Sequence, residues 1–76
     1  MSDRIKEIIA RAVNLPVEQV GDDTAMLQTP AWDSLKHMEI IVSIEQEFAC
    51  DLTLDEIVEM KTVGDIRRIL AARGKV

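Results

Sequence analysis

The spacing of the apolar residues constrains the fold of this chain more than any other feature of its sequence. In the first segment, apolar side chains recur at helical intervals and charged residues fill the positions between them: Ile5, Ile8, Ile9, Ala12 and Val13. Segments 33–49 and 62–73 show the same period, and no segment alternates apolar and polar residues as a half-buried strand would. The sequence therefore predicts an all-α protein.

Capping residues and a proline set the ends of the first two helices. Ser2 is expected to be the N-cap of the first helix, with Asp3 beside the positive end of its dipole. Asn14 and Pro16 are expected to end it, because proline disfavours α geometry in the residue before it. The second helix is expected to begin at Asp33-Ser34 and to run to about 47–49.

Two further helices follow. Thr53-Leu54-Asp55-Glu56 is a capping-box sequence, which predicts a short third helix extending to about Glu59. Thr62 is expected to cap a fourth helix that has Asp65 in its first turn and is closed by Gly74. The prediction is a four-helix bundle of three main helices and one short one, with a long loop between the first and second helices.

That loop runs from Leu15 to Trp32. We expect four apolar side chains to hold it against the helices: Val17, Val20, Met26 and Leu27. Asp22 or Asp23 is expected to cap a short helical turn within it. A divalent cation site at Asp22-Asp23-Thr24 is the less favoured alternative, because an EF-hand loop also needs a glycine and a terminal glutamate.

Length and composition limit the class of protein. Seventy-six residues allow one small domain, residues 1–76. Its single cysteine, Cys50, excludes an internal disulfide. We expect Cys50 to be a small, partly buried residue. We expect a cytoplasmic protein, because a lone cysteine suits a reducing compartment and the start lacks a signal peptide's apolar stretch. We also expect a monomer. The chain has no apolar run long enough for membrane insertion, and its net charge of −5 argues against binding nucleic acid.

The second helix has two apolar faces. At about 100° per residue, one arc is an ordinary core stripe that also includes His37: Ile40, Ile41, Ile44 and Phe48. Leu35, Met38 and Val42 lie on a separate arc, and Glu45, which is expected to be in contact with water, lies between the two. The second arc either packs under the long loop or forms an exposed apolar patch flanked by Glu39 and Glu45, which would suit a basic, partly apolar partner.

The acidic charge is concentrated around this helix. Residues 33–61 hold eight acidic and two basic side chains, whereas the segment after them is net positive. A solvated acidic face is the commoner explanation of such a bias in small proteins, so charge alone does not identify a docking surface.

The tripeptide Asp33-Ser34-Leu35 is the strongest candidate site. A serine directly after an Asp N-cap lies at the positive pole of its helix, where free backbone N–H groups would stabilise a phosphate ester on its oxygen. The alternative is that Asp33 merely caps the helix and Ser34 begins it. His37, one turn away, could suggest a hydrolase base, but no oxyanion-hole motif accompanies it and packing against the loop is the preferred reading. We therefore expect no catalytic residue and no metal site.

With this context, the sequence resembles the acyl carrier proteins and related phosphopantetheine-binding carrier domains. Asp33-Ser34-Leu35 at the start of the second helix resembles the attachment motif of that family. The resemblance covers nearly the whole chain and includes Glu45-Gln46-Glu47-Phe48, the apolar Leu52 and Thr62-Val63. It implies that a phosphopantetheinyl transferase moves 4′-phosphopantetheine from coenzyme A onto Ser34, and that the carrier itself catalyses nothing.

The resemblance also assigns roles to the two apolar arcs. It implies that Leu35, Met38, Glu39, Val42 and Glu45 dock onto basic patches of acyl-loading and acyl-processing enzymes. It implies that a second set lines the core and, in some members, a pocket for the acyl chain: Ile40, Ile44, Phe48, Leu52, Ile57, Val63 and Ile66.

The residues around the attachment motif depart from those of housekeeping fatty-acid carriers. Trp32 precedes the motif, and Lys36 and His37 follow it in place of an acidic residue. This pattern is more similar to carriers of specialised pathways, including polyketide, cell-envelope and amino-acid-loading systems, and we expect a carrier of a specialised lipid, polyketide or cell-envelope pathway. Two alternatives remain: an aminoacyl or peptidyl carrier, which would share the attachment site, and a helical interaction module that is never modified.

Overall fold

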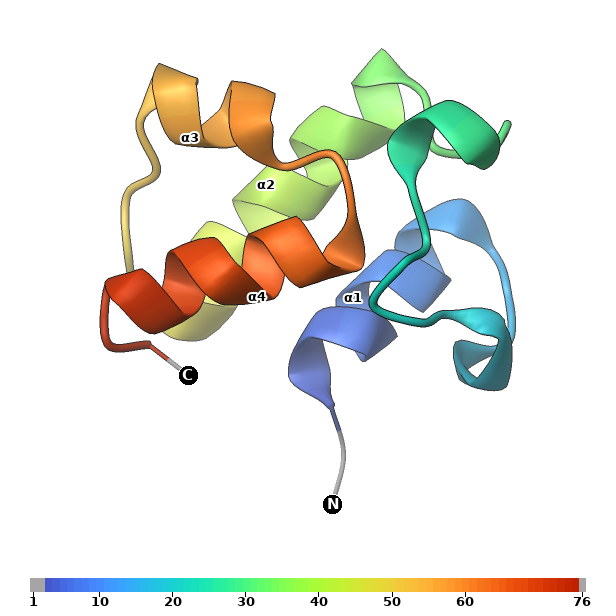
Figure 1. Cartoon of the computed structure of the whole chain (residues 1–76), viewed down its shortest axis with the longest axis horizontal. Coiled ribbons are helices and arrows are strands. Elements are labelled where there is room, and N and C mark those ends of the chain that lie inside the picture. The colour runs from blue at the N-terminus through green and yellow to red at the C-terminus, as the bar shows by residue number, and fades with distance from the viewer. Residues whose placement is uncertain (1–2, 76) are drawn as a thin grey trace.

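The chain forms a bundle of α-helices, as the sequence predicts. A computed structural model describes residues 3–75 and contains the following elements (Figure 1): α1 (Arg4–Val13), the 3₁₀ turns η1 (Val17–Gln19) and η2 (Met26–Gln28), α2 (Ser34–Phe48), the short α3 (Leu54–Glu59) and α4 (Val63–Ala72). Within residues 3–75 there is no strand, and the extended backbone pairs only at one isolated bridge, between Ala25 and Thr62.

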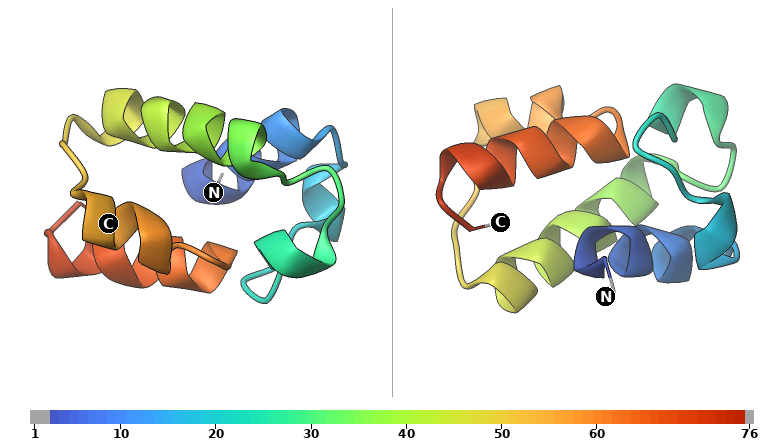
Figure 2. Two further views of the ribbon diagram at one scale, coloured as in Figure 1. Left: turned by 90° about the horizontal axis from the view of Figure 1, so that it is seen from above. Right: turned by 60° about the horizontal axis from the view of Figure 1, so that its bottom comes forward.

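The three long helices enclose the core. α2 and α4 lie on opposite sides of the molecule in the left view of Figure 2, and the loop 14–33 closes one end. α3 connects the end of α2 to the start of α4 along one edge (Figure 1). The buried side chains come from all three long helices, from the loop and from the segment after α3: Ile5, Ile9, Ala10, Val13, Val20, Trp32, Ile40, Ile41, Ile44, Met60, Val63, Ile66, Ile69 and Leu70.

The expected helix ends are confirmed, with one correction at the N-terminus. The N-cap of α1 is Asp3 and not Ser2, which lies outside the described residues; the Asp3 carboxylate accepts a hydrogen bond from the Lys6 amide at 3.3 Å. Asp3 is the residue directly before the first helical position, so its short side chain reaches the third amide of the helix. At the other end Asn14 adopts the left-handed conformation at φ 59°, which is common where a helix ends and which asparagine tolerates better than most residues.

The long loop is anchored through its backbone more than through its apolar side chains. Val20 is buried and Met26 is half-buried, but Val17 is exposed and Leu27 is 89% exposed, so the prediction that all four hold the loop is wrong for these two. The loop instead pairs with the segment entering α4: the Met26 amide donates to the Lys61 carbonyl at 2.8 Å. Backbone pairing of this kind leaves no signal in side-chain hydropathy.

The acidic pair in the loop does not cap a helical turn, because η1 and η2 begin after Pro16 and Ala25. The Asp22 carboxylate instead accepts from the Arg67 guanidinium at 2.9 Å, and the Asp22 carbonyl accepts from the Gly64 amide at 2.8 Å. A Cβ at Gly64 would approach that carbonyl to 3.1 Å, so the glycine permits close contact between the loop and α4. These contacts engage Asp22, which the sequence suggested as a helix cap or, less favoured, as a cation ligand.

Because α3 has only six residues, it depends on tertiary contacts for its stability. Its predicted capping box is present, with Thr53 and Glu56 each bonding the other's backbone amide. The Glu56 carboxylate also binds the Arg73 guanidinium at the end of α4. This hydrogen-bonded ion pair lowers the pKa of Glu56 from 4.5 to about 2.

The Glu56–Arg73 pair predicts a specific dependence of stability on pH. Because the pKa of Glu56 is lower in the folded chain, its contribution to stability is fully present above pH about 4.5 and is lost as the pH falls toward about 2. Replacement Glu56→Gln should therefore lower the thermal midpoint near neutral pH and have little effect at pH about 2. Thermal unfolding followed by circular dichroism measures both.

Glu59→Gln is the matched control, since Glu59 is exposed on the same helix and the replacement removes the same charge. An equal loss of midpoint in the two variants near neutral pH would show that net charge, and not the pair with Arg73, causes the effect.

Candidate functional site

The start of α2 holds the candidate serine. Asp33 is the N-cap, and its carboxylate accepts from the Lys36 amide at 2.9 Å, while its carbonyl accepts from the His37 amide at 2.8 Å. Ser34 is the first helical residue and is exposed. Its hydroxyl therefore lies in solvent at the positive end of α2, where the first-turn amides have no acceptor within the helix.

Trp32 fixes the approach of the loop to this serine. Its side chain is only 1% exposed, and its indole N–H donates to Nδ1 of His37 at 3.1 Å. Because indole nitrogen is a donor only, Nδ1 of His37 carries no proton. The proton of the neutral ring is then on Nε2, which donates to the Ile57 carbonyl of α3 at 3.0 Å.

These contacts decide the question of a hydrolase base. His37 is buried, with 8% exposure, and both ring nitrogens are engaged, one by Trp32 and the other by Ile57. The ring therefore cannot accept a proton from Ser34. The expected packing of His37 against the loop is confirmed through Trp32, and the hydrogen bond to α3 is a contact that the sequence did not indicate.

The second apolar arc of α2 faces solvent. Leu35, Met38 and Val42 are 69%, 49% and 48% exposed, so they do not pack under the loop. Of the two alternatives that the sequence left open, the structure shows an exposed apolar patch, which we call the α2 patch. α3 adds the exposed side chains of Leu54 and Val58, which periodicity could not resolve in so short a helix.

The two glutamates beside the α2 patch differ in their surroundings. Glu39 is exposed and pairs with Lys36 at 3.3 Å. Glu45 is half-buried, and its carboxylate accepts from the Leu52 amide at 2.9 Å. The expectation that Glu45 is in contact with water is thus only partly met. One of its carboxylate oxygens is bound by the Leu52 amide and so holds the segment between α2 and α3.

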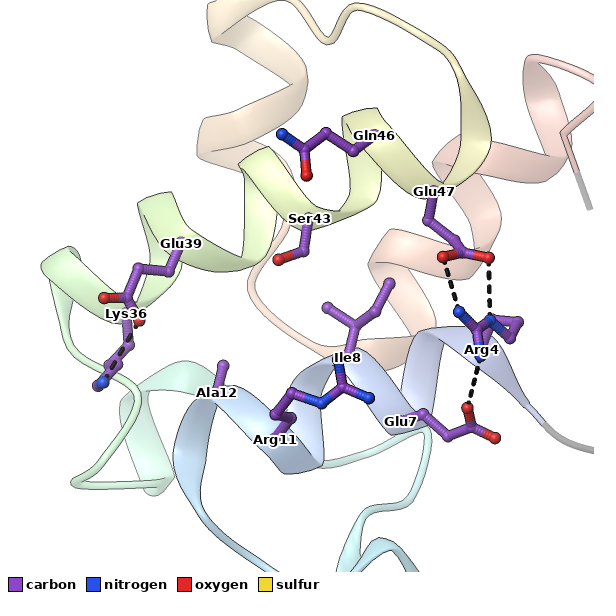
Figure 3. A pocket seen from close by; sticks show the side chains of 10 residues that line it. All are labelled: Arg4, Glu7, Ile8, Arg11, Ala12, Lys36, Glu39, Ser43, Gln46 and Glu47. Atoms are coloured by element: carbon purple, nitrogen blue, oxygen red, sulfur yellow. Dashed lines mark hydrogen bonds and ion pairs between the residues drawn. The ribbon is translucent and has the colours of Figure 1, made fainter.

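A groove of about 400 Å³ lies between α1 and the polar side of α2 (Figure 3). Its charged side chains mostly bind one another: Arg4 pairs with Glu47 at 2.7 Å and with Glu7 at 3.0 Å. Ser43 and Gln46 line the same groove. The Arg4–Glu47 pair connects α1 to α2 across this groove.

Metal sites, the free cysteine and membrane-spanning helices were also considered in the sequence, and the structure bears on each of them. Within residues 3–75 no group of three or more His, Cys, Asp and Glu side chains is placed to hold a metal ion. Cys50 is a half-buried free thiol, as expected. No helix in the described part of the chain is long and apolar enough to cross a membrane.

The start of α2 thus presents an exposed serine at a helix N-terminus, next to an exposed apolar patch. In a comparison with known proteins, a family model described as the phosphopantetheine attachment site matches residues 3–70. The chain therefore belongs to the family of phosphopantetheine-binding carriers, which are not enzymes and hold 4′-phosphopantetheine covalently.

Curated relatives cover almost all of the chain. Proteins called acyl carrier protein from Bradyrhizobium sp. (strain ORS 278), Nitrobacter hamburgensis and Rhodopseudomonas palustris (strain TIE-1) are each 28% identical to it over 75 residues. The alignments span 99% of this chain and 95% of each relative. The sequence-based recognition of the carrier family is thus confirmed.

The residues at the start of α2 fit a phosphopantetheine group. An exposed hydroxyl can be reached by a modifying enzyme, and the helix N-terminus stabilises the negative charge of the phosphodiester. The neighbouring Asp33 carboxylate is held by the Lys36 amide, which directs it toward the backbone.

The N-cap bond predicts how two variants of Asp33 will differ. Asp33→Ala should lower the free energy of unfolding by about 1 kcal/mol, because the Lys36 amide loses its acceptor. Asp33→Asn should have a small effect, because asparagine caps equally well. Urea denaturation of both variants measures the difference, and an equally large loss in the Asn variant would show that charge and not capping matters.

Proposed function

We propose that this domain, residues 1–76, is an acyl carrier protein whose 4′-phosphopantetheine arm is attached to Ser34. The observation that supports this assignment most directly is the exposure of Ser34 at the first position of α2, directly after the Asp33 cap. The family match implies the prosthetic group, and the names of the relatives support acyl groups as the cargo.

The arm would be transferred by a phosphopantetheinyl transferase. The Ser34 oxygen attacks the phosphorus next to the pantetheine of coenzyme A, the diphosphate bond breaks, and the adenosine bisphosphate portion leaves. The serine proton passes to the transferase, since His37 is occupied by Trp32 and Ile57. When bound, the arm supplies a thiol that carries acyl groups as thioesters.

The α2 patch is proposed as the docking surface for the transferase and for acyl-loading and acyl-processing enzymes. Leu35, Met38 and Val42 offer apolar contact next to the attachment serine. Glu39 and Glu45 lie beside them and favour partners with basic patches. The neighbouring α3 adds exposed acidic charge at Asp55 and Glu59.

We further propose a specialised pathway for lipids, polyketides or the cell envelope. The Lys36–Glu39 pair supports this, because it compensates an acidic side chain on the docking surface close to Ser34. The Trp32–His37 bond supports it as well, because it depends on residues that distinguish the attachment region from that of housekeeping carriers.

Attachment at Ser34 has a direct test. Incubation with coenzyme A and a broad-specificity transferase should increase the intact mass of the wild type by one phosphopantetheine group. Ser34→Ala should abolish the increase, and Ser43→Ala should not, although Ser43 is also an exposed serine on α2. An unmodified wild type, or a modified Ser34→Ala variant, contradicts the proposal.

Docking through the α2 patch predicts a defect in binding rather than in chemistry. Val42→Asp should raise the KM of the transferase for the carrier by about tenfold, or about 1.4 kcal/mol, with kcat retained. Stability should change by less than about 0.5 kcal/mol, because the side chain is half exposed.

Ser43→Asp is the matched control, since it adds the same charge at the next position, on the polar side of α2. Equal KM values for the two variants would place the docking surface elsewhere.

A further inference from the structure

Trp32 and His37 lie on either side of the candidate serine in the sequence and bind each other in the folded chain. Counted from the Asp33 N-cap, Trp32 is the residue before the cap and His37 is the fourth residue of α2. Apolar side chains at these two positions commonly pack together and fix the angle at which the chain enters a helix. Here the indole N–H donates to Nδ1 of His37 at 3.1 Å, and the ring centroids are 6.0 Å apart. We call this contact the Trp32–His37 bracket.

The bracket is shielded from water, because both of its side chains are buried. A shielded hydrogen bond is costly to leave unmade, since water is not there to replace the lost partner. The ring of His37 is held a second time, from α3, through the bond from Nε2 to the Ile57 carbonyl at 3.0 Å. The two rings are therefore fixed relative to each other and to α3.

Ser34 lies between the two residues of the bracket. Its own side chain is exposed, whereas the residues two before it and three after it are buried. The Asp33 cap holds the first turn of α2 through its bonds to the amides of Lys36 and His37. The cap thus fixes the turn, and the bracket fixes the direction of the chain that enters it. The Ser34 backbone is held on both sides, so that its hydroxyl moves mainly by rotation of the side chain.

Transfer of the arm depends on where that hydroxyl is held. The Ser34 oxygen forms a bond to phosphorus as the diphosphate bond of coenzyme A breaks, the adenosine bisphosphate portion leaves, and the serine proton passes to the transferase. The attacking and leaving oxygens must lie roughly in line. Misplacing the attacking atom by about 1 Å can cost about 100-fold in rate. A fixed backbone at Ser34 therefore favours the chemical step.

We propose that Trp32 and His37 are positioning residues for this transfer and act through the backbone on either side of Ser34. The inference rests on the proposed attachment of the arm to Ser34. The bracket and the α2 patch then have separate effects on the reaction: the bracket raises kcat, and the patch lowers KM. The two effects separate because the bracket is buried and the side chains of the α2 patch are exposed, so a docked transferase contacts the patch directly.

Steady-state kinetics of the transferase tests this division. His37→Leu keeps a side chain of similar size but removes the acceptor, so kcat should fall about tenfold, or about 1.4 kcal/mol in the barrier, with KM retained. His37→Gln should keep the wild-type kcat, because its amide offers an acceptor to Trp32 and a donor to the Ile57 carbonyl. A wild-type kcat in folded His37→Leu, a loss confined to KM, or a His37→Gln variant as slow as His37→Leu would each overturn the inference.

Ile69→Val is the control for stability. It removes a buried methyl group near the C-terminal end of α4, which lies away from the start of α2 (Figure 1), and it leaves both bracket residues in place. It should therefore keep the wild-type kcat. Circular dichroism gives the folded fraction of each variant under the assay conditions. If Ile69→Val lowers kcat as much as His37→Leu at equal folded fraction, lost stability explains the effect and the inference fails.

A double-mutant cycle tests whether the two residues act as one unit. Trp32→Phe removes the same hydrogen bond from the side of the loop and should also lower kcat with KM retained. Because the two replacements remove one shared bond, kcat of the double variant Trp32→Phe/His37→Leu should be no lower than that of the slower single variant. Losses that multiply would show that the residues act separately and would overturn the bracket.

The remaining outcomes are also decisive. If His37→Leu does not fold, Trp32→Phe decides alone, and a wild-type kcat in that variant overturns the inference. A wild type that gains no arm contradicts the proposed function instead. A wild type that gains the arm on Ser34, with bracket variants that keep its kcat, contradicts only the positioning role, so the two failures are distinguishable.

Discussion

The arrangement around Ser34 depends on the burial of one indole ring. Trp32 ends the long loop, is 1% exposed, and brings a hydrogen-bond donor into the core. Such a donor needs an acceptor inside the protein, and His37 provides it one turn into α2. The bond sets the tautomer of His37, which in turn allows the ring to hold α3 through the Ile57 carbonyl. Three segments next to Ser34 are thereby fixed by one buried polar network.

The rest of the domain shows how a small chain without a disulfide keeps a long loop in place. The loop is joined to the start of α4 by backbone hydrogen bonds from Met26, Val63 and Gly64. Arg67 binds both Asp3 before α1 and Asp22 in the loop, at 2.6 and 2.9 Å. These contacts connect parts of the chain that are far apart in sequence, so the loop is held where it leads into α2.

The distribution of charge has a different meaning in the folded chain than in the sequence. The concentration of acid in residues 33–61 suggested an acidic surface on the second helix. In the structure, Glu39 and Glu47 of α2 pair with Lys36 and Arg4. The apolar side chains of the α2 patch are therefore the more distinctive feature of the proposed docking surface, with steering by charge a secondary contribution.

The sequence by itself determined the helices, most of their caps and the candidate serine, because these depend on local properties; only the N-cap of α1 was assigned one residue too early, to Ser2 instead of Asp3. Apolar spacing, the Asp33 cap, the Thr53 capping box and the Thr62 cap each act within a few residues, and the structure contains all of them. The attachment motif was recognisable for the same reason, as a short sequence at a helix start.

Only the tertiary structure decided which faces of those helices are covered. Periodicity placed Leu35, Met38 and Val42 on one side of α2 but could not show that this side stays exposed. The bond of Glu45 to the Leu52 amide and the bond of His37 to the Ile57 carbonyl join residues 7 and 20 positions apart in the sequence. The exposure of Leu27 likewise depends on how the loop packs against the helices. The physical reason is that burial and hydrogen-bond partners are properties of packed surfaces, and a sequence pattern records only which side chains are available to form them.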